Sequence, residues 1–314
     1  MLSDRARFAH IGLAFGRLGL AWDDAVVVEG SVPHRAVNIC RAHPKVAVLP
    51  TPGFGPAELG SALLHRVASR TLVVFSALGD PFRERFERVD PAEAMCRGWE
   101  GVSMVLCLDE SRQDGPSPAV TGPLTGPDSW ALPDGEFGAG AGTGTVLPYE
   151  ARALALARLG PRAGDLVWDI GSGRGAVAIE CARLGAAAVA VERSAAGVER
   201  VRANTAAHGV EVRAVRGEAP AVLSHLADPD GVFVGGRSGA PGELESVVET
   251  AARRARRAVV VAVPDPARIA PVRSALTSCG FAAEGVLLRS ERLDGPGVFS
   301  AAAVPPVCLV WGTR

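Results

Sequence analysis

Residues 167–175 constrain this chain more than any other stretch, because they read Val-Trp-Asp-Ile-Gly-Ser-Gly-Arg-Gly. An apolar run ends at Asp169, glycines follow at positions 171, 173 and 175, and a helical pattern begins at Ala176. Glycine permits a sharp turn and leaves bare main chain against which a ligand can lie. The start of the helix then offers unpaired N–H groups to a polar ligand. The stretch therefore predicts a strand, a ligand-binding turn and a helix.

The ends of the next two apolar runs narrow the class of ligand. Glu192 ends the run 188–191, where a carboxylate would accept both hydroxyls of a ribose. Gly217-Glu218-Ala219 ends the run 212–215, where an adenine ring would lie. This arrangement favours S-adenosylmethionine over a nicotinamide cofactor, which Gly-x-Gly-x-Gly alone would also suit. A Rossmann-like domain with an empty crevice is the third alternative.

Strand and helix patterns alternate through the C-terminal part, which indicates a parallel sheet covered on both faces. Five such units and a terminal hairpin predict a seven-stranded sheet with ligand at the carboxyl ends of its strands. The predicted strands are 166–169, 188–191, 212–215, 232–234, 258–263, 286–290 and 307–311. The predicted helices are 149–159, 176–184, 195–207, 220–226, 242–254 and 266–279.

The first 112 residues predict a smaller α/β domain with no cofactor loop of its own. Strands are expected at 25–28, 46–49, 72–75 and 102–108, and helices at 34–42 and 56–67. The turn 51–56 is rich in glycine, but its prolines cannot donate N–H groups, so we interpret it as a loop and not as a phosphate cradle. The Gly-, Pro- and Ser-rich stretch 113–130 is the predicted linker to residues 131–314.

Composition excludes several classes of function. The net charge of −1 gives no electrostatic argument for nucleic acid or anionic membrane as a partner. The six cysteines form no Cys-x-x-Cys pair, so we expect reduced thiols and no bound metal. Arginines at positions 5, 7 and 17 interrupt any apolar run that would serve as a signal peptide, and we expect a cytoplasmic protein.

The C-terminal part resembles the decarboxylating precorrin C15-methyltransferases of cobalamin synthesis over roughly residues 131–314. The matching words are Leu132-Pro133-Asp134-x-x-Phe137, Glu150-Ala151-Arg152-Ala153-Leu154-Ala155-Leu156, the glycine stretch itself, Ala178-Ile179-Glu180, Val191-Glu192-Arg193, Gly217-Glu218-Ala219-Pro220 and Val232-Phe233-Val234-Gly235-Gly236. The resemblance implies a class I, seven-stranded Rossmann-like methyltransferase domain with S-adenosylmethionine as its cofactor.

The N-terminal part resembles the second half of the precorrin C5-methyltransferase, which is often fused ahead of the C15 enzyme. The matching words are Arg17-Leu18-Gly19-Leu20, the run from Ala36 to Leu49, and Gly53-x-Gly55-Pro56-Ala57-Glu58-Leu59. The half of the C5 enzyme that carries much of its own cofactor site has no counterpart in this sequence. We therefore expect residues 1–112 to be a non-catalytic remnant used for packing or for homo-oligomer formation.

One departure from the family concerns the acceptor. Where the C15 enzymes usually have Thr-Lys, this chain has Leu147-Pro148-Tyr149. An apolar, aromatic wall favours a small, less acidic acceptor from specialised metabolism over a polycarboxylate tetrapyrrole. Precorrin C15-methylation with decarboxylation is the alternative activity, and a non-catalytic cofactor-binding or scaffold protein is the rival from another class.

The candidate site comprises two residues on the acceptor side and a set that would hold the cofactor. Tyr149 and Arg237 are the candidates for contact with the acceptor, and helix packing and a solvated loop are their respective alternatives. Asp169 is expected either to brace the glycine loop or to reach the cofactor's amine. Adenine would meet Glu218 directly or Ala219 through its backbone. The cofactor set is Leu147, Asp169, Gly171, Ser172, Gly173, Arg174, Gly175, Glu192, Arg193, Gly217, Glu218, Ala219 and Gly235.

Overall fold

The structure is a computed structural model that describes residues 4–64, 70–112, 129–138, 146–235, 242–263, 265–290 and 306–314. The chain divides into two compact units, residues 1–126 and 127–314, and each is described by itself. The division into a domain at 1–112, a linker at 113–130 and a domain at 131–314 stays a prediction, because most of that linker lies outside the described residues.

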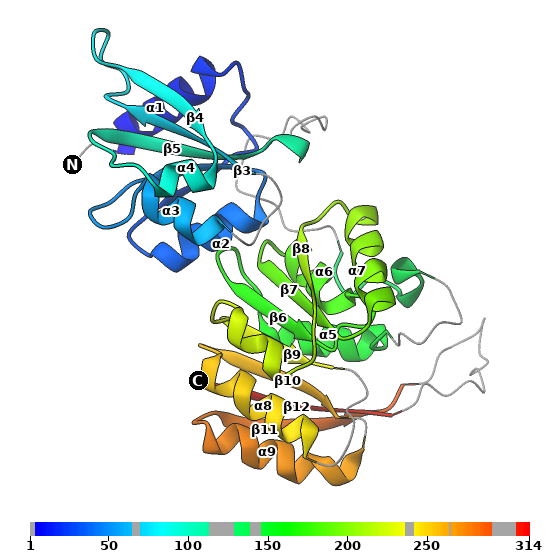
Figure 1. Cartoon of the computed structure of the whole chain (residues 1–314). Helices are drawn as coiled ribbons and strands as arrows, with labels where there is room; N and C mark the ends of the chain where they lie inside the picture. The colour runs from blue at the N-terminus through cyan, green and yellow to red at the C-terminus, as the bar shows by residue number, and fades with distance from the viewer. Residues whose placement is uncertain are drawn as a thin grey trace. The chain divides into compact units, whose positions relative to one another are not determined.

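The N-terminal unit is built on a five-stranded sheet in the order β1-β2-β5-β3-β4 (Figure 1). Only β1 and β2 run parallel, and the other neighbours pair antiparallel. The strands are β1 Val26–Glu29, β2 Lys45–Leu49, β3 Arg70–Ser76, β4 Arg85–Val89 and β5 Val102–Asp109. The helices are α1 Asp4–Arg17, α2 Pro33–Ala42, α3 Pro56–Leu63 and α4 Pro91–Met95, and a 3₁₀ turn, Glu110–Arg112, follows β5.

Alternating side chains of the central strands build two cores on opposite faces of this sheet. Val46 and Val74 pack with α2, α3 and α4 on one face. Ala47 and Phe75 pack with Ile11 and Phe15 of α1 on the other face. Because helices cover both faces, β2, β3 and β5 are buried along most of their length.

The sequence pattern missed three elements of this unit, α1, α4 and β4. Strand β4 reads Arg-Phe-Glu-Arg-Val, lies at an edge of the sheet and exposes four of its five residues. An exposed edge strand rich in charge has no continuous apolar run to reveal it. The predicted helix 56–67 is observed as α3, which ends at Leu63, and residues 65–69 lie outside the described residues.

The C-terminal unit is a seven-stranded sheet in the order β11-β12-β10-β9-β6-β7-β8 (Figure 1). Strands β6 to β10 run parallel, and β12 pairs antiparallel with both β10 and β11. The strands are β6 Leu166–Ile170, β7 Ala187–Glu192, β8 Val212–Arg216, β9 Gly231–Val234, β10 Ala258–Val263, β11 Ala282–Leu288 and β12 Val307–Thr313. The helices are α5 Tyr149–Leu159, α6 Ala176–Arg183, α7 Ala195–Ala207, α8 Glu243–Arg254 and α9 Ile269–Ser278.

Helices cover both faces of this sheet. Side chains from α5, α6 and α7 form the two apolar clusters of one face. On the other face the guanidinium of Arg254 in α8 lies 4.9 Å from the ring centre of Trp168, which is fully buried in β6. The predicted α/β fold class is confirmed, with a seven-stranded Rossmann-like domain preceded by a smaller α/β unit.

Three predicted elements of this unit differ in detail. The expected helix 266–279 divides into a 3₁₀ turn, Pro266–Arg268, and α9, and Asp265 caps the turn through the N–H of Ala267. The expected helix 220–226 is a 3₁₀ helix, Ala221–His225. The expected strand 286–290 is observed as 282–288, because most of β11 is exposed and its apolar pattern is weak.

Candidate active site

The glycine loop joins β6 to α6, and its backbone explains its sequence. Gly171, Gly173 and Gly175 have φ angles of 71°, 60° and 78°, a region that residues with a Cβ rarely adopt. Gly175 is the N-cap residue of α6, and its N–H donates to the carbonyl oxygen of Ser172 at 2.8 Å. The N–H groups of Ala176 and Val177, the first two residues of α6, keep their capacity to bind a polar ligand.

Hydrogen bonds tie the loop to the end of the neighbouring strand, β7. The N–H groups of Gly171 and Ser172 donate to the carbonyl oxygen of Val191, at 3.0 and 3.2 Å. The N–H of Gly173 donates to Glu192 Oε2 at 3.3 Å. The loop therefore lies directly beside the carboxylate that the sequence indicated.

The carboxylate of Glu192 is held from a second side. Its Oε1 accepts hydrogen bonds from the N–H and the hydroxyl of Ser194, both at 3.1 Å. A Cβ on Gly197 would lie 2.3 Å from Cγ of Glu192, so only glycine fits there. Sequence analysis missed Gly197, although a glycine in the first turn of a helix is the kind of position that close packing requires.

Asp169, at the end of β6, braces the start of α6. It is buried, and its Oδ2 accepts a hydrogen bond from the N–H of Ala178 at 3.0 Å. Burial raises the pKa of Asp169 to about 7, and the charge of Glu192 adds to that rise. Of the two roles left open from the sequence, the observed contact fits the brace.

The third strand end, that of β8, meets the same edge of the sheet. The N–H of Gly217 donates to the carbonyl oxygen of Glu192 at 3.1 Å, and a Cβ on Gly217 would lie 2.5 Å from Val222. Glu218 is exposed and Ala219 is half-buried. On the other side of β6, the N–H of Gly235 donates to Ile170 at 2.8 Å. The fold thus brings the predicted strand-end residues to one edge.

Two of the predicted cofactor residues have other surroundings. Nη1 of Arg174 donates to the carbonyl oxygens of Phe137 and Gly138. Arg193 is exposed. Asn204 of α7, which the sequence did not single out, donates to Phe137 at 3.1 Å and to the carbonyl oxygen of Arg174 at 2.9 Å. Arg174 and Asn204 together hold the backbone at Phe137 and Gly138.

The acceptor side is described in part. Leu147 is half-buried against the apolar cluster beneath α5. Tyr149 is the first residue of α5 and is 39% exposed, so its ring is accessible to a ligand. Arg237 and residues 139–145 lie outside the described residues. Sequence analysis also passed over Arg152 and Glu180 as site residues, although each is a charge within an otherwise apolar helix face, and both are fully buried.

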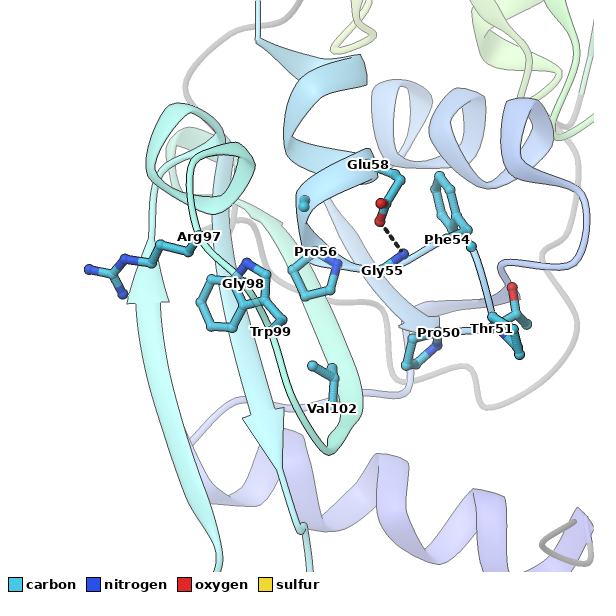
Figure 2. A pocket seen from close by; sticks show the side chains of 13 residues that line it. Pro50, Thr51, Phe54, Gly55, Pro56, Glu58, Arg97, Gly98, Trp99 and Val102 are labelled. Carbon is cyan, nitrogen blue, oxygen red and sulfur yellow. Dashed lines mark hydrogen bonds between the residues drawn. The ribbon is translucent and has the colours of Figure 1, made fainter.

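A second glycine-rich turn lies in the N-terminal unit, at residues 51–56, and borders a hollow of about 550 Å³ (Figure 2). Three prolines, Phe54 and Trp99 supply much of its lining. The turn leads into α3, where the N–H of the N-cap residue Gly55 donates to Glu58 Oε2 at 2.8 Å. Pro56, the first residue of α3, has no N–H to offer. This helix start is therefore occupied by its own side chain and agrees with the loop interpretation.

Within the described ranges, no group of three or more His, Cys, Asp or Glu side chains is placed to hold a metal ion. The six cysteines form no disulfide in the structure. No helix in the part of the chain that the structure describes has the length and apolar character needed to span a membrane.

The chain is similar to a protein family, to curated relatives and to a solved structure, all of them precorrin methyltransferases. Residues 140–280 match the family model of the precorrin methyltransferase domain. Curated relatives include precorrin-6Y C(5,15)-methyltransferases, described as decarboxylating, from Sinorhizobium sp. and Mycobacterium tuberculosis. Each relative is 33% identical to this chain. The two alignments cover 77% and 76% of this chain, and 57% and 58% of the Sinorhizobium and Mycobacterium relatives. The crystal structure of a precorrin-6y C5,15-methyltransferase from Geobacter metallireducens aligns with a TM-score of 0.53 at 25% identity, over 59% of this chain and 97% of that one.

These matches confirm the predicted methyltransferase class and agree with S-adenosylmethionine as its cofactor. The chain spans less than three fifths of the length of the two curated relatives. Its sequence and fold resemble those of the decarboxylating precorrin-6Y C5,15-methyltransferases, and the match to the precorrin methyltransferase domain lies within the C-terminal unit.

Proposed function

We propose that the C-terminal unit binds one S-adenosylmethionine at the loop 171–175 and transfers its methyl group to a small-molecule acceptor. The observation that carries this proposal is a helix start, with the N–H groups of Ala176 and Val177 available, behind three glycines with positive φ and beside the carboxylate of Glu192. The buried hydroxyl of Ser172 adds to it, since that oxygen has no hydrogen-bond partner among the described residues. A polar ligand in the loop would satisfy these groups.

The residues around the loop take distinct roles in this proposal. Glu192 accepts the two ribose hydroxyls, and Glu218 or the backbone of Ala219 meets the adenine. Asp169 holds the loop in place through α6. Leu147 and Gly235 line the site from the other side. The remaining cofactor candidates are Gly171, Gly173, Arg174, Gly175, Arg193 and Gly217.

The bound cofactor would supply an electrophilic methyl group on a sulfonium, which leaves as a neutral thioether when the acceptor's electron pair displaces it. This chemistry needs in-line geometry and a separation of about 3 Å more than it needs acid–base groups. The protein's task is then to position two ligands and to exclude water. A catalytic triad or a pair of carboxylates is not required.

We further propose that the acceptor is smaller and less acidic than a precorrin. Leu147, Pro148 and Tyr149 stand where the C15 family usually has a hydroxyl and a base, which removes donors for substrate carboxylates. A polycarboxylate entering an apolar pocket would lose several kcal/mol for each poorly compensated ion. Apolar and aromatic contact, with Tyr149 and Arg237 on the acceptor side, would hold a compact heterocyclic molecule instead.

Precorrin C15-methylation with decarboxylation is the second candidate activity. The names of the curated relatives favour it. A non-catalytic protein that binds the cofactor is the third. A cytoplasmic location, homo-oligomer formation and a non-catalytic role for residues 1–112 remain predictions.

Methyl transfer by the purified full chain separates these candidates. We expect label from S-adenosylmethionine to appear on a small aromatic or heterocyclic acceptor and not on a precorrin. Tyr149→Ala should raise the KM for the acceptor by about tenfold, which corresponds to about 1.4 kcal/mol, and leave cofactor affinity nearly unchanged. Phe82→Ala, at an aromatic residue of the N-terminal unit that is 95% exposed, is the control. Efficient turnover of a precorrin would establish the second candidate, and cofactor binding without any transfer would establish the third.

A further inference from the structure

A buried ion pair joins α5 to α6. Arg152 and Glu180 both have fully buried side chains, and Nε of Arg152 lies 3.5 Å from Oε1 of Glu180. Burying two charges costs free energy unless each is paired and hydrogen-bonded, so such a pair is poor evidence for added stability alone. The hydrogen bonds around it indicate another role.

The guanidinium of Arg152 holds two separate stretches of backbone. Its Nη1 donates to the carbonyl oxygen of Leu147 at 2.7 Å and to Asp134 Oδ1 at 3.1 Å. Its Nη2 donates to the carbonyl oxygen of Leu132. The ring of Phe137 lies against it, with 4.8 Å from the guanidinium carbon to the ring centre. One side chain therefore fixes the chain at residues 132–137 and again at residue 147.

Glu180 completes the contact from α6. Its Oε1 accepts a hydrogen bond from the N–H of Leu132 at 2.6 Å, and its Oε2 accepts from the N–H of Ala131 at 3.2 Å. Ala131 has a φ of 57°, a left-handed conformation that a non-glycine residue keeps only where its surroundings impose it. The carboxylate of Glu180 is such a constraint.

We propose that Arg152 and Glu180 are positioning residues for the cofactor site. They hold Leu147, on the border of that site, in a fixed register with α6, which directly follows the glycine loop. The inference rests on the proposed function, since it takes Leu147 and the loop as parts of one cofactor site. Neither side chain touches the cofactor, and both act through the backbone that they hold.

The chain contains a matched control at the opposite end of α5. Arg257 donates to the carbonyl oxygens of Leu159 and Gly160, at 2.7 and 3.1 Å, and pairs with the buried Asp165 at 2.6 Å. Like Arg152, this arginine donates to backbone carbonyl oxygens and also has a carboxylate partner. It lies at the amino ends of the parallel strands, where β6 begins, and so at the edge of the sheet opposite the glycine loop.

The test compares Arg152→Met with Arg257→Met in the full chain, with S-adenosylmethionine affinity measured by calorimetry. We expect Arg152→Met to weaken binding by about tenfold or more, because a displacement of about 1 Å is enough to disable a preorganised site. Arg257→Met should stay within about twofold of the unchanged protein even where its melting temperature falls, because its contacts lie at the opposite edge. Equal losses in the two variants, or an unchanged affinity in Arg152→Met, would overturn the proposal.

Two further measurements keep the result decisive. If Arg152→Met does not fold, Arg152→Lys replaces it, because lysine keeps the charge beside Glu180 but lacks the planar fork that serves several acceptors. Unchanged affinity in that folded variant also overturns the proposal.

Hydrogen exchange at the amides of Ala131 and Leu132 reports on the contact without any ligand. If the unchanged protein binds no cofactor, the proposed function fails, and faster exchange in the Arg152 variant but not in the Arg257 variant would still establish the contact. Equal exchange rates in the two variants would show that Arg152 does not hold these amides in place.

Discussion

Each unit has a glycine-rich turn between a buried strand and a helix, and the two turns differ in what satisfies the first N–H groups of that helix. In the N-terminal unit the turn at 51–56 leads into α3, whose N-cap N–H is taken by Glu58 and whose first residue is Pro56. In the C-terminal unit the loop 171–175 leads into α6, where Asp169 accepts from the N–H of Ala178 and the N–H groups of Ala176 and Val177 stay available. The two leading N–H positions of α3 are therefore taken or absent, whereas the first two residues of α6 can donate to a ligand.

The comparison shows that glycine content alone does not identify a binding loop. What matters is which group satisfies the first N–H groups of the helix that follows. A glutamate three residues after the N-cap closes the N-terminal turn from within its own helix. In the C-terminal loop the nearest carboxylates, Asp169 and Glu192, come from strand ends, and Asp169 accepts only from the N–H of Ala178, the third residue of α6.

The largest expected effect is on cofactor affinity, when a bulky residue is placed in the loop 171–175 and, for comparison, in the turn 51–56. Gly173→Val should weaken S-adenosylmethionine binding by at least about 100-fold, because a branched side chain fills the ligand's space and φ is 60° there. Gly53→Val also meets a positive φ, of 85°, and should cost about 1–3 kcal/mol of stability in the N-terminal unit. Its cofactor affinity should not change. Calorimetry on both variants checks the pair.

The reverse pattern would break the comparison. Loss of cofactor binding in Gly53→Val together with retained binding in Gly173→Val would place the site in the N-terminal unit. The hollow beside residues 51–56 would then be the binding site.

A smaller effect concerns the buried acid, which only the C-terminal loop has at the end of its preceding strand. Because the pKa of Asp169 is about 7 and the ordinary value is 3.8, the folded protein keeps this proton where the unfolded chain has lost it. The free energy of unfolding therefore falls as pH rises through that interval. Asp169→Asn removes the titration and keeps an oxygen for Ala178. The melting temperature of the variant relative to the unchanged protein should be higher at about pH 8 than at about pH 5.

Thermal melts of the two proteins at both pH values supply their own control, because every other titrating group is shared. A difference in melting temperature that is the same at both pH values would show that Asp169 is ionised throughout. The brace would then depend on a charged carboxylate.

The sequence predicted the C-terminal sheet well because its parallel strands are buried on both faces and read as continuous apolar runs. It predicted that the glycine loop and Glu192 meet at one edge of the sheet, because these residues come at the ends of those runs. It missed β4 and most of β11, which are exposed and lack an apolar pattern. It missed the contacts of Arg152 with Leu147 and Leu132, since they depend on how the chain returns to α5.

The most direct test of the account is the number of S-adenosylmethionine molecules that the full chain binds, measured by calorimetry. The available N–H groups of Ala176 and Val177 in α6 and the self-capped start of α3 predict one molecule per chain, and none in Gly173→Val. Two molecules per chain, or one that survives Gly173→Val, would contradict the account and make the N-terminal unit a cofactor site.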